Sequence, residues 1–375
     1  MTENRAMTDR HLIQVVSGFR PDVDGMGDYA RHLAEELWRQ AQVSSTILVF
    51  HRPKKGTEVA DGEGWSVCYP PTASAQSLAA ELQRQMQLKP QARVLLHYGP
   101  YAYSDDGMPL RFAESMAGLS ADRRLTVFFH ELWARGWPWK RAFWTRSNQL
   151  RAVRTLLAAS RLGLSSSALY LNRLRSILEV QKPLVQVRIF SNIGEVERPL
   201  PLRKREPRLV VFGQIATRIR LYRQYGKQLE KLCSILHLES VVDAGSGESE
   251  AIPERIGSLP LKRRGFLSEE AASNLLATSV AGVLHYGPIA WEKSGVVAAY
   301  QAHGMLPIIA PRVMEGFRPF PGMPFALIGD LLRKREPMRL EEMQALADQA
   351  HGFYCQEVAL AQAALRITTA LELNR

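Results

Sequence analysis

The strongest constraint on the fold is a repeated alternation of short apolar runs with segments of helical periodicity. Turn residues bound each run, and the segment after the first run places Tyr29, Leu33 and Leu37 on one face of a helix. This alternation is typical of βαβ units, which build a parallel sheet covered by helices. Strands are expected at 12–18, 46–51, 66–69, 94–98, 125–130, 162–166 and 185–190, and again at 208–213, 241–245, 262–267, 281–286 and 306–310.

One stretch interrupts this pattern and divides the strands into two groups. Residues 195–207 are rich in proline and charge and lack any strand or helix period, so we expect a linker there. A chain of 375 residues is long enough for two domains with separate cores. We therefore predict α/β domains at 1–194 and 208–350, and a C-terminal helix within 351–375 that packs back toward the first domain. The pentapeptide LHYGP occurs at 96–100 and at 284–288, which is consistent with two similar domains or with coincidence.

The net charge of +11 and the pI near 9.7 predict attraction to anions. Phosphate groups, an acidic membrane surface and nucleic acid all satisfy this condition, and charge alone does not choose among them. Nucleic acid is the least favoured partner, because the basic residues form no known binding motif and lie within the αβ repeats.

Cysteine usage and the N-terminal sequence indicate the compartment. Cys68, Cys233 and Cys355 are far apart and odd in number, which predicts neither a disulfide framework nor a metal site and fits a reducing cytoplasm. The apolar stretch at 11–19 is too short for a signal peptide or a membrane span. Any contact with a membrane is therefore expected to be peripheral.

Two segments of the first half carry candidate binding groups. Gly25 and Gly27 lie between the first strand and a helix, where main-chain N–H groups and the helix dipole favour phosphate; a structural turn with Asp28 as N-cap is the alternative. His130 ends a strand and precedes Trp133, Trp137 and Trp139. Histidine can bind a hydroxyl and tryptophan can stack on a sugar, although core aromatics with a polar cap would give the same pattern.

Two further segments lie in the second half. Gly213 ends a strand and is followed by Arg218, Arg220, Arg223 and Lys227. A glycine turn with guanidinium groups at a helix start forms a plausible diphosphate clamp, in which we favour Arg218, since some of the basic residues must face solvent.

The second of these segments is the loop after the strand at 281–286. Glu292 can accept hydrogen bonds from sugar hydroxyls, and Lys293 can neutralise phosphate. Ser294 and Gly295 open a helix that supplies main-chain donors to the same region. A simple capped loop is the alternative interpretation.

The order of these motifs resembles the GT4-type retaining glycosyltransferases of the GT-B superfamily, and the likeness covers nearly the whole chain. It rests on SGFRPDVDGMGDYARHLAEEL at 17–37, FFHE at 128–131, FGQIATR at 212–218 and the long passage from RRGFL at 263–267 to LPII at 306–309. The resemblance implies two Rossmann-like domains facing across a cleft, no metal and no cofactor, and a nucleotide-diphosphate sugar as donor substrate.

The resemblance also implies roles for individual residues. Gly25 and Gly27 would lie near the donor phosphate and acceptor, His130 would contact the transferred sugar, and Arg218 would hold the diphosphate. The remaining implied donor-site residues are Gly213, Phe266, Leu267, Glu292, Lys293, Ser294 and Gly295. The family's second glutamate, which binds the donor ribose, falls on Tyr300, so ribose binding by a carboxylate is not expected. The usual lysine after the arginine is displaced, and Lys293 or Lys227 would have to replace it.

The sequence therefore predicts a cytoplasmic glycosyltransferase that acts on a glycan or lipid-linked acceptor, as in polysaccharide biosynthesis, with an anionic membrane surface as a further partner. A GT-B nucleotide-sugar epimerase or hydrolase would share the donor site without needing an acceptor. A non-catalytic nucleotide-binding protein is the third reading, suggested by the tyrosine in place of the second glutamate.

Overall fold

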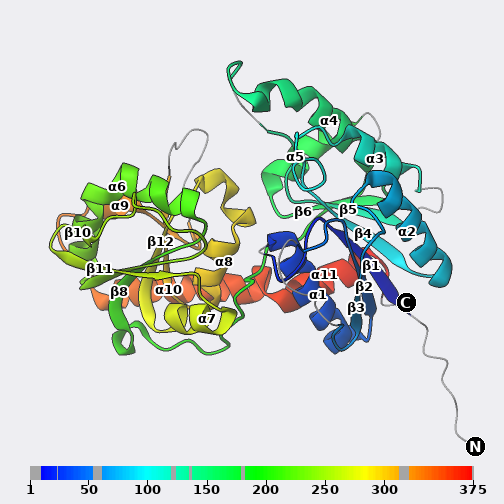
Figure 1. The fold of residues 1–375 in the computed structure, drawn as a ribbon. Helices are drawn as coiled ribbons and strands as arrows, with labels where there is room; N and C mark the ends of the chain where they lie inside the picture. The colour runs from blue at the N-terminus through cyan, green and yellow to red at the C-terminus, as the bar shows by residue number, and fades with distance from the viewer. Residues whose placement is uncertain are drawn as a thin grey trace, which may run out of the picture. The chain divides into compact units, whose positions relative to one another are not determined.

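The computed structural model of the protein describes residues 10–22, 24–53, 61–119, 124–134, 137–178, 182–311 and 321–373. The chain forms two compact units, one of Met1–Arg188 with Ala363–Arg375 and one of Ile189–Gln362 (Figure 1). Residues 195–207, expected as a linker, belong to the second unit. They contain a 3-10 turn at Leu202–Lys204, and the side chains of Leu202 and Arg205 are buried, which proline and charge content did not reveal.

The first unit is built on a parallel sheet whose described strands follow the order β3-β2-β1-β4-β5-β6-β7. The strands β1, β2, β4, β5 and β6 are largely apolar and buried, as expected for a parallel sheet with helices on its faces. The strands are β1 His11–Val16, β2 Ser44–Val49, β3 Trp65–Cys68, β4 Arg93–Tyr98, β5 Leu125–Phe129, β6 Leu162–Ser165 and β7 Leu184–Gln186. The helices of this part are α1 Gly25–Ala41, α2 Ala75–Leu88, α3 Leu110–Ala117, α4 Arg141–Ala159 and α5 Ala168–Arg175.

The second unit repeats this plan. Its described strands follow the order β10-β11-β9-β8-β12-β13-β14, and the pairs are parallel except β10 with β11. They are β8 Glu206–Phe212, β9 Ser240–Ala244, β10 Arg255–Ile256, β11 Leu259–Gly265, β12 Ser279–His285, β13 Leu306–Ala310 and β14 Ala326–Leu327. The helices are α6 Ile215–Ile235, α7 Glu269–Ala277, α8 Gly295–Ala302, α9 Ile328–Leu332 and α10 Leu340–Phe353.

Each sheet has one point where the strand order reverses. In the first sheet β1 pairs with both β2 and β4, and in the second β8 pairs with both β9 and β12. The two copies of LHYGP lie at corresponding places, because they end β4 and β12. In open α/β sheets, ligands bind beyond the carboxyl ends of the strands at this reversal.

The C-terminal segment differs from the single helix expected within 351–375. The chain forms a π-helical turn at Tyr354–Val358, turns at Ala359 and continues as α11, Leu360–Ala370. The Glu195 carboxylate stabilises the break by accepting hydrogen bonds from the Leu360 N–H at 2.7 Å and the Tyr354 hydroxyl at 2.6 Å. Apolar spacing continues across Ala359, so it did not predict this break. Among the described residues, no helix combines the length and apolarity that crossing a bilayer requires.

Candidate functional site

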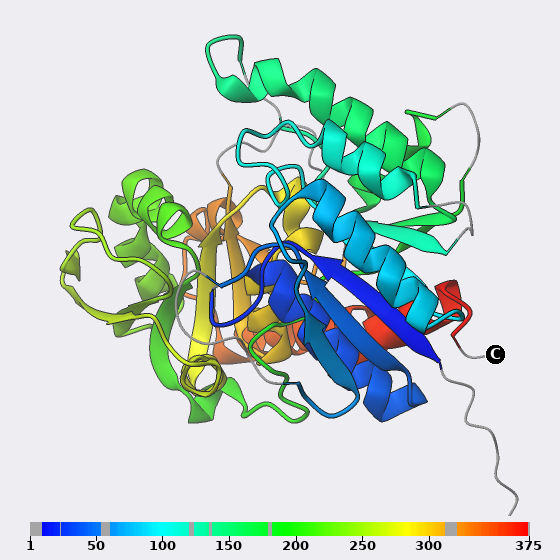
Figure 2. The same ribbon diagram turned by 45° about the vertical axis from the view of Figure 1, so that its right-hand side comes forward.

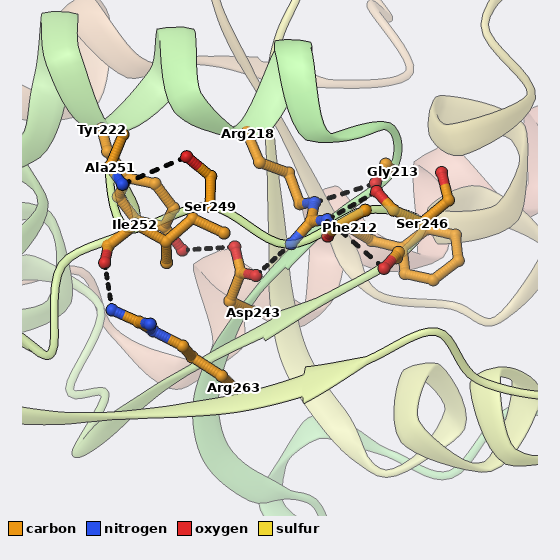
Figure 3. A network of polar contacts seen from close by, with 12 residues as sticks. Phe212, Gly213, Arg218, Tyr222, Asp243, Ser246, Ser249, Ala251, Ile252 and Arg263 are labelled. Carbon is orange, nitrogen blue, oxygen red and sulfur yellow. Dashed lines mark hydrogen bonds and ion pairs between the residues drawn. The ribbon is translucent and has the colours of Figure 1, made fainter.

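One buried arginine ties together the carboxyl ends of two strands, β8 and β9, in the second sheet. Arg218 lies in the first turn of α6 and is 1% exposed. Its Nε donates to the Gly213 carbonyl at 2.9 Å, and its Nη2 donates to the carbonyls of Ser246 at 2.8 Å and Gly247 at 2.6 Å. Its Nη1 pairs with the Asp243 carboxylate (Figure 3). These donors are engaged by the protein, so we assign Arg218 to positioning the loops and no longer expect it to hold a diphosphate directly.

Asp243 completes this buried charge network. The carboxylate is 1% exposed, and its second oxygen accepts a hydrogen bond from the Tyr222 hydroxyl at 2.8 Å. Burial, reinforced by the neighbouring carboxylate, raises the pKa of Tyr222 above its ordinary value, so that the hydroxyl remains a donor. A buried charge needs such a partner, because leaving it unpaired costs several kcal/mol (about 3–5). Sequence reasoning missed Asp243 because it ends an otherwise apolar strand.

Glycine allows the strand ends to approach each other this closely. Gly245 has a φ of 135°, and a Cβ there would lie 2.0 Å from the Gly213 carbonyl oxygen. The Gly245 N–H donates to the Gly265 carbonyl at 2.8 Å, which joins the ends of β9 and β11. The signal in the sequence was AGSG at 244–247, directly after an expected strand.

A pocket of about 540 Å³ opens beside this network, at the carboxyl ends of β9 and β11. Its volume falls within the usual range for small-molecule sites. It is lined by Arg218, Asp243, Gly247, Glu248, Ser249, Glu250, Ile252, Arg263, Arg264 and Gly265. Arg263 donates from Nη2 to the Ile252 carbonyl (Figure 3), and both Arg263 and Arg264 are exposed. The pocket therefore combines a buried ion pair in its wall with exposed guanidinium groups.

The reversal point of the second sheet brings together several predicted residues. Gly213 follows β8, and a Cβ there would lie 3.4 Å from Val296 Cγ2, so the glycine turn is next to the start of α8. Ser294 caps this helix, because its Oγ accepts a hydrogen bond from the Val297 N–H at 3.2 Å. Gly295 is the first residue of α8. Gly213, Ser294 and Gly295 therefore lie at one edge of the second sheet.

The loop before α8 holds the other two predicted residues. Glu292 and Lys293 lie at the end of a 3-10 turn, Pro288–Lys293, that follows β12, and both side chains are half-buried. Trp291 anchors this turn, because its ring packs against Phe325 with centroids 5.5 Å apart. The turn is thus attached to the core, while Glu292 and Lys293 remain partly accessible.

Phe266, Leu267 and Tyr300 occupy very different environments. Phe266 and Leu267 follow the last residue of β11 instead of ending the strand, and the Phe266 ring is 69% exposed. Tyr300 is 0% exposed; its hydroxyl accepts from the Phe212 N–H at 3.1 Å and lies 3.3 Å from the Val210 carbonyl, to which it donates. We therefore assign Tyr300 to the core and no longer expect it to contact a ligand.

The two glycines at the start of α1 in the first unit, Gly25 and Gly27, also have different roles. Asp24 is the N-cap, and its Oδ1 accepts hydrogen bonds from the N–H groups of Met26 at 2.9 Å and Gly27 at 2.8 Å. A Cβ on Gly27 would lie 2.4 Å from the Gly18 carbonyl oxygen, whereas one on Gly25 would meet nothing within 4 Å. Gly27 is thus a packing glycine whose N–H is already used, and Gly25 alone remains a candidate for ligand contact.

The capping residue itself differs from the expected one. The alternative considered from sequence was an N-cap at Asp28, but Asp28 lies inside α1 and pairs with Arg20 Nε at 2.8 Å. Burial raises the pKa of the Asp24 carboxyl, while hydrogen bonds from the helix N–H groups and from Ser17 act in the opposite direction. The cap position follows from chain geometry that GMGD alone does not specify.

His130 stands at the carboxyl end of β5 and continues a chain of polar contacts into the core. Its Nε2 lies 2.9 Å from Nδ1 of His97, whose Nε2 lies 3.1 Å from Oε1 of Gln14. Gln14 in turn donates from Nε2 to the Ala30 carbonyl at 3.0 Å. The His130 ring stacks on Phe128 with centroids 4.2 Å apart.

This chain determines which nitrogen of each neutral histidine carries the proton. Because Gln14 Nε2 is a donor to a carbonyl, its Oε1 is an acceptor, and Nε2 of His97 must donate to it. His97 Nδ1 is then an acceptor, so His130 donates to it from Nε2. Burial, assisted by His130, lowers the pKa of His97 well below its ordinary value, which keeps His97 neutral. Neither Gln14 nor His97 was recognised from the sequence.

The three tryptophans that follow His130 do not share one environment. Trp133 is half-buried and packs against the first core. Trp137 and Trp139 are 67% and 75% exposed and stack on each other, with centroids 5.3 Å apart and ring planes 5° apart. The structure therefore separates a core tryptophan from an exposed pair.

Comparison with known proteins finds matches among solved structures and none among family models or curated proteins. No family model matches the chain, and no curated protein matches it. Solved structures of glycosyltransferases do match. A trehalose 6-phosphate synthase from Burkholderia multivorans superposes with a TM-score of 0.60 and 11% identity over 98% of both chains. A glycosyltransferase from Rickettsia africae gives 0.58 and 12%, covering 98% of this chain and 99% of that one.

A third match is an α-glucosyltransferase solved in complex with UDP-glucose and DNA, with a TM-score of 0.59 and 11% identity over 97% of this chain and 99% of that one. Identities this low carry information about the fold alone. The sheet orders and these superpositions together establish that the chain has the GT-B fold of two Rossmann-like domains.

Proposed function

We propose that this protein is a GT4-type retaining glycosyltransferase that uses a nucleotide-diphosphate sugar as donor. The observation that carries the proposal is the pocket beside Arg218 and Asp243, which lies at the carboxyl ends of strands in a sheet of GT-B topology. Structures of similar fold include an enzyme in complex with UDP-glucose. In this proposal the Arg218 network holds the pocket open, and the exposed guanidinium groups of Arg263 and Arg264 attract the anionic nucleotide.

The diphosphate and the sugar are assigned to the reversal point of the second sheet. The main-chain donors at the start of α8, next to the glycine turn at Gly213, would face the phosphates, with Lys293 supplying positive charge. Glu292 would accept hydrogen bonds from sugar hydroxyls. Phe266 and Leu267, beside the pocket residue Gly265, would contact the base.

The proposed reaction moves one glycosyl group and needs neither metal nor cofactor. A bond forms between the acceptor oxygen and the anomeric carbon as the bond from that carbon to the phosphate oxygen breaks. The acceptor proton passes to the leaving phosphate oxygen, and Lys293 with the α8 N-terminus stabilises the resulting charge. His130 would contact a hydroxyl of the transferred sugar, while Gly25 would lie near the acceptor.

The acceptor is proposed to be a glycan or a lipid-linked sugar, handled in the cytoplasm at the inner face of a membrane. The high positive charge supports this, because lipid diphosphates and anionic headgroups are attracted to it.

Nucleotide binding is tested first, and sugar transfer is tested second. A nucleoside diphosphate that binds only the folded chain raises its melting temperature, so UDP, GDP and ADP are compared individually, with EDTA present to test metal independence. The preferred nucleotide then selects the sugar donors for a transfer assay. Lys293→Gln is expected to weaken binding, whereas Lys334→Gln, a surface change on the same unit, is the matched control. Absence of stabilisation by all three nucleotides would overturn the proposal.

A non-catalytic nucleotide-binding protein is the second candidate, favoured by one observation. The position of the family's second glutamate is occupied by Tyr300, which is enclosed in the core. If nucleotide stabilises the protein but Glu292→Gln and wild type show equal, background release of nucleotide from every donor, this second function replaces the first.

A further inference from the structure

An exposed aromatic cluster projects from the first unit at the start of α4. Trp137, Trp139 and Trp144 are 67%, 75% and 72% exposed, and Phe143 is 41% exposed. In both ribbon views α4 runs along the outside of the first unit, and the turn before it projects beyond the rest of that unit (Figures 1 and 2). Large aromatic side chains are costly to leave in water, and an exposed cluster of them marks a binding surface. We call these four residues the tryptophan tip.

The tryptophan tip is an ordered structure. Trp137 and Trp139 stack face to face, and Nε1 of Trp144 donates to the Pro138 carbonyl at 2.7 Å. The Lys140 N–H donates to the Trp137 carbonyl at 2.8 Å, which closes the turn. Because the rings are already held in place, binding through them would cost little conformational entropy. Since Trp137 and Trp139 also cover one face of each other, the pair is poorly suited to enclosing a single sugar ring.

The charge around the tryptophan tip is positive. Lys140, Arg141 and Arg146 are exposed among the aromatic residues, and Arg151 and Arg154 follow on the solvent-facing side of α4. The sequence has no Asp or Glu from 132 to 178. Among the described residues, Asp106 faces Arg141, and its pKa is lowered first by hydrogen bonds from Ser104 and Met108 and to a smaller extent by Arg141. Positive charge therefore dominates the surface.

We propose that the tryptophan tip inserts into the headgroup layer of an anionic lipid bilayer and docks the first unit on the membrane. Tryptophan prefers the membrane interface, and lysine and arginine beside it bind anionic headgroups. Charge complementarity selects this occupant over a neutral apolar partner. This proposal makes the membrane association in the proposed function more specific, and it depends on no other part of that function. Vesicle binding requires no sugar donor, so the two can fail separately.

The test measures sedimentation of the full chain with vesicles of phosphatidylglycerol and phosphatidylcholine, against phosphatidylcholine alone. Replacing Trp137, Trp139 and Trp144 together by Ser is expected to weaken binding at least about tenfold. The control, Leu88→Ser with Leu365→Ser, removes exposed apolar side chains elsewhere in the same unit, 60% and 52% exposed, and should bind as wild type does.

A second pair of variants tests the charge. Lys140→Gln, Arg141→Gln and Arg146→Gln together are expected to lower binding to the anionic vesicles by at least about tenfold. The same loss of charge at Arg203, Lys204 and Lys262, in the second unit, should have a much smaller effect. Tryptophan fluorescence of the wild type should shift to shorter wavelength on anionic vesicles as the rings leave water.

Three outcomes would overturn the proposal. One is equal binding by the triple-Ser variant and wild type, when both remain folded by circular dichroism. Another is an unchanged fluorescence spectrum on vesicles that do sediment the protein. The third is concentration-dependent self-association of the wild type that the triple-Ser variant loses, because the tip would then join two copies of the chain.

Discussion

His97 and His285 stand at the same position of LHYGP, on β4 and β12, which occupy corresponding places in their sheets. In the first unit, His97 is buried and neutral and lies within a chain of hydrogen bonds that runs from Gln14 to His130. In the second unit, Nε2 of His285 lies 2.9 Å from Oε1 of Gln224, and the polar centre is the ion pair of Arg218 and Asp243. The same topology thus supports two kinds of carboxyl edge, one with a neutral buried histidine and one with a buried ion pair.

The comparison shows that the two edges favour ligands of different chemistry. A neutral histidine held in one tautomer can exchange hydrogen bonds with hydroxyl groups without attracting ions. A glycine-rich edge supported by a buried ion pair, with guanidinium groups exposed nearby, favours an anion. The difference comes from side chains at the strand ends and leaves the strand order unchanged.

The largest expected effect on stability comes from removing the buried ion pair of Arg218 and Asp243. Asp243→Ala should lower the free energy of unfolding of the second unit by about 3–5 kcal/mol, because it leaves the Arg218 guanidinium buried and unpaired. Urea unfolding followed by circular dichroism measures this. Asp330→Ala, which removes a partner of Arg333 on the surface, is the control and should cost no more than about 1 kcal/mol.

A double variant separates the pair from its packing. Arg218→Met with Asp243→Leu removes both charges and should recover much of the loss, since a buried ion pair is often replaceable by apolar groups of similar volume. Equal costs for Asp243→Ala and Asp330→Ala would mean that the ion pair does not hold the second edge together.

The next largest effect on stability concerns Gly25 and Gly27, at the carboxyl edge of the first sheet. Gly27→Ala should destabilise the first unit by about 1–3 kcal/mol, because the new methyl group would overlap the Gly18 carbonyl and force the backbone apart. Gly25→Ala should change stability by less than about 0.5 kcal/mol, because nothing lies near the added atom. Thermal unfolding of both variants tests this, and the opposite ranking would contradict the assignment of Gly27 to packing.

Strand positions were largely readable from the sequence, because buried parallel strands are apolar on both faces. The expected run at 281–286 became β12, Ser279–His285, and the run at 46–51 became β2, Ser44–Val49. The two-residue strands β10 and β14 were missed, since they carry no measurable pattern. The run at 185–190 was too long: β7 ends at Gln186, although Val187 and Phe190 remain buried.

The site was predictable where local chain signals determine it and not where distant segments do. Ser294 as a cap and Gly213 at a strand end follow from neighbouring residues. The burial of Arg218 depends on carbonyls from the loop after β9, and Tyr300 packs its ring against Gly282 of β12, where a Cβ would lie 2.6 Å away. Such contacts join residues far apart in the sequence, so residue type and spacing could not reveal them.

A third prediction uses pH to compare buried histidines of the two units. Burial lowers the pKa of His97 in the first unit and of His303 in the second. Below about pH 6.5 the unfolded chain therefore binds protons that the folded chain does not, and stability falls as the pH falls, by up to about 1.4 kcal/mol per pH unit for each histidine.

Substitution shows which unit carries this dependence. His97→Gln should flatten the pH dependence of the first unit's free energy of unfolding between about pH 6.5 and 5, and His303→Gln that of the second. Urea titrations over this range are the measurement, with His237→Asn as the control for loss of an exposed histidine. An unchanged slope in His97→Gln would show that His97 takes up a proton while folded, and the tautomer assigned to His130 would then be wrong.

The smallest effect sharpens the assignment of the second edge to a nucleotide. Phe266 is 69% exposed directly after β11, so its loss should leave the free energy of unfolding within about 0.5 kcal/mol of wild type. If its ring stacks on the base, Phe266→Ala weakens nucleoside diphosphate binding by about 0.5–1.5 kcal/mol in titration calorimetry. Leu340→Ala, at another exposed apolar residue of the same unit, should alter neither quantity. Unchanged affinity in Phe266→Ala would contradict stacking of the base on Phe266. The pocket wall formed by Arg218 and Asp243 would then be the remaining candidate for contact with the base.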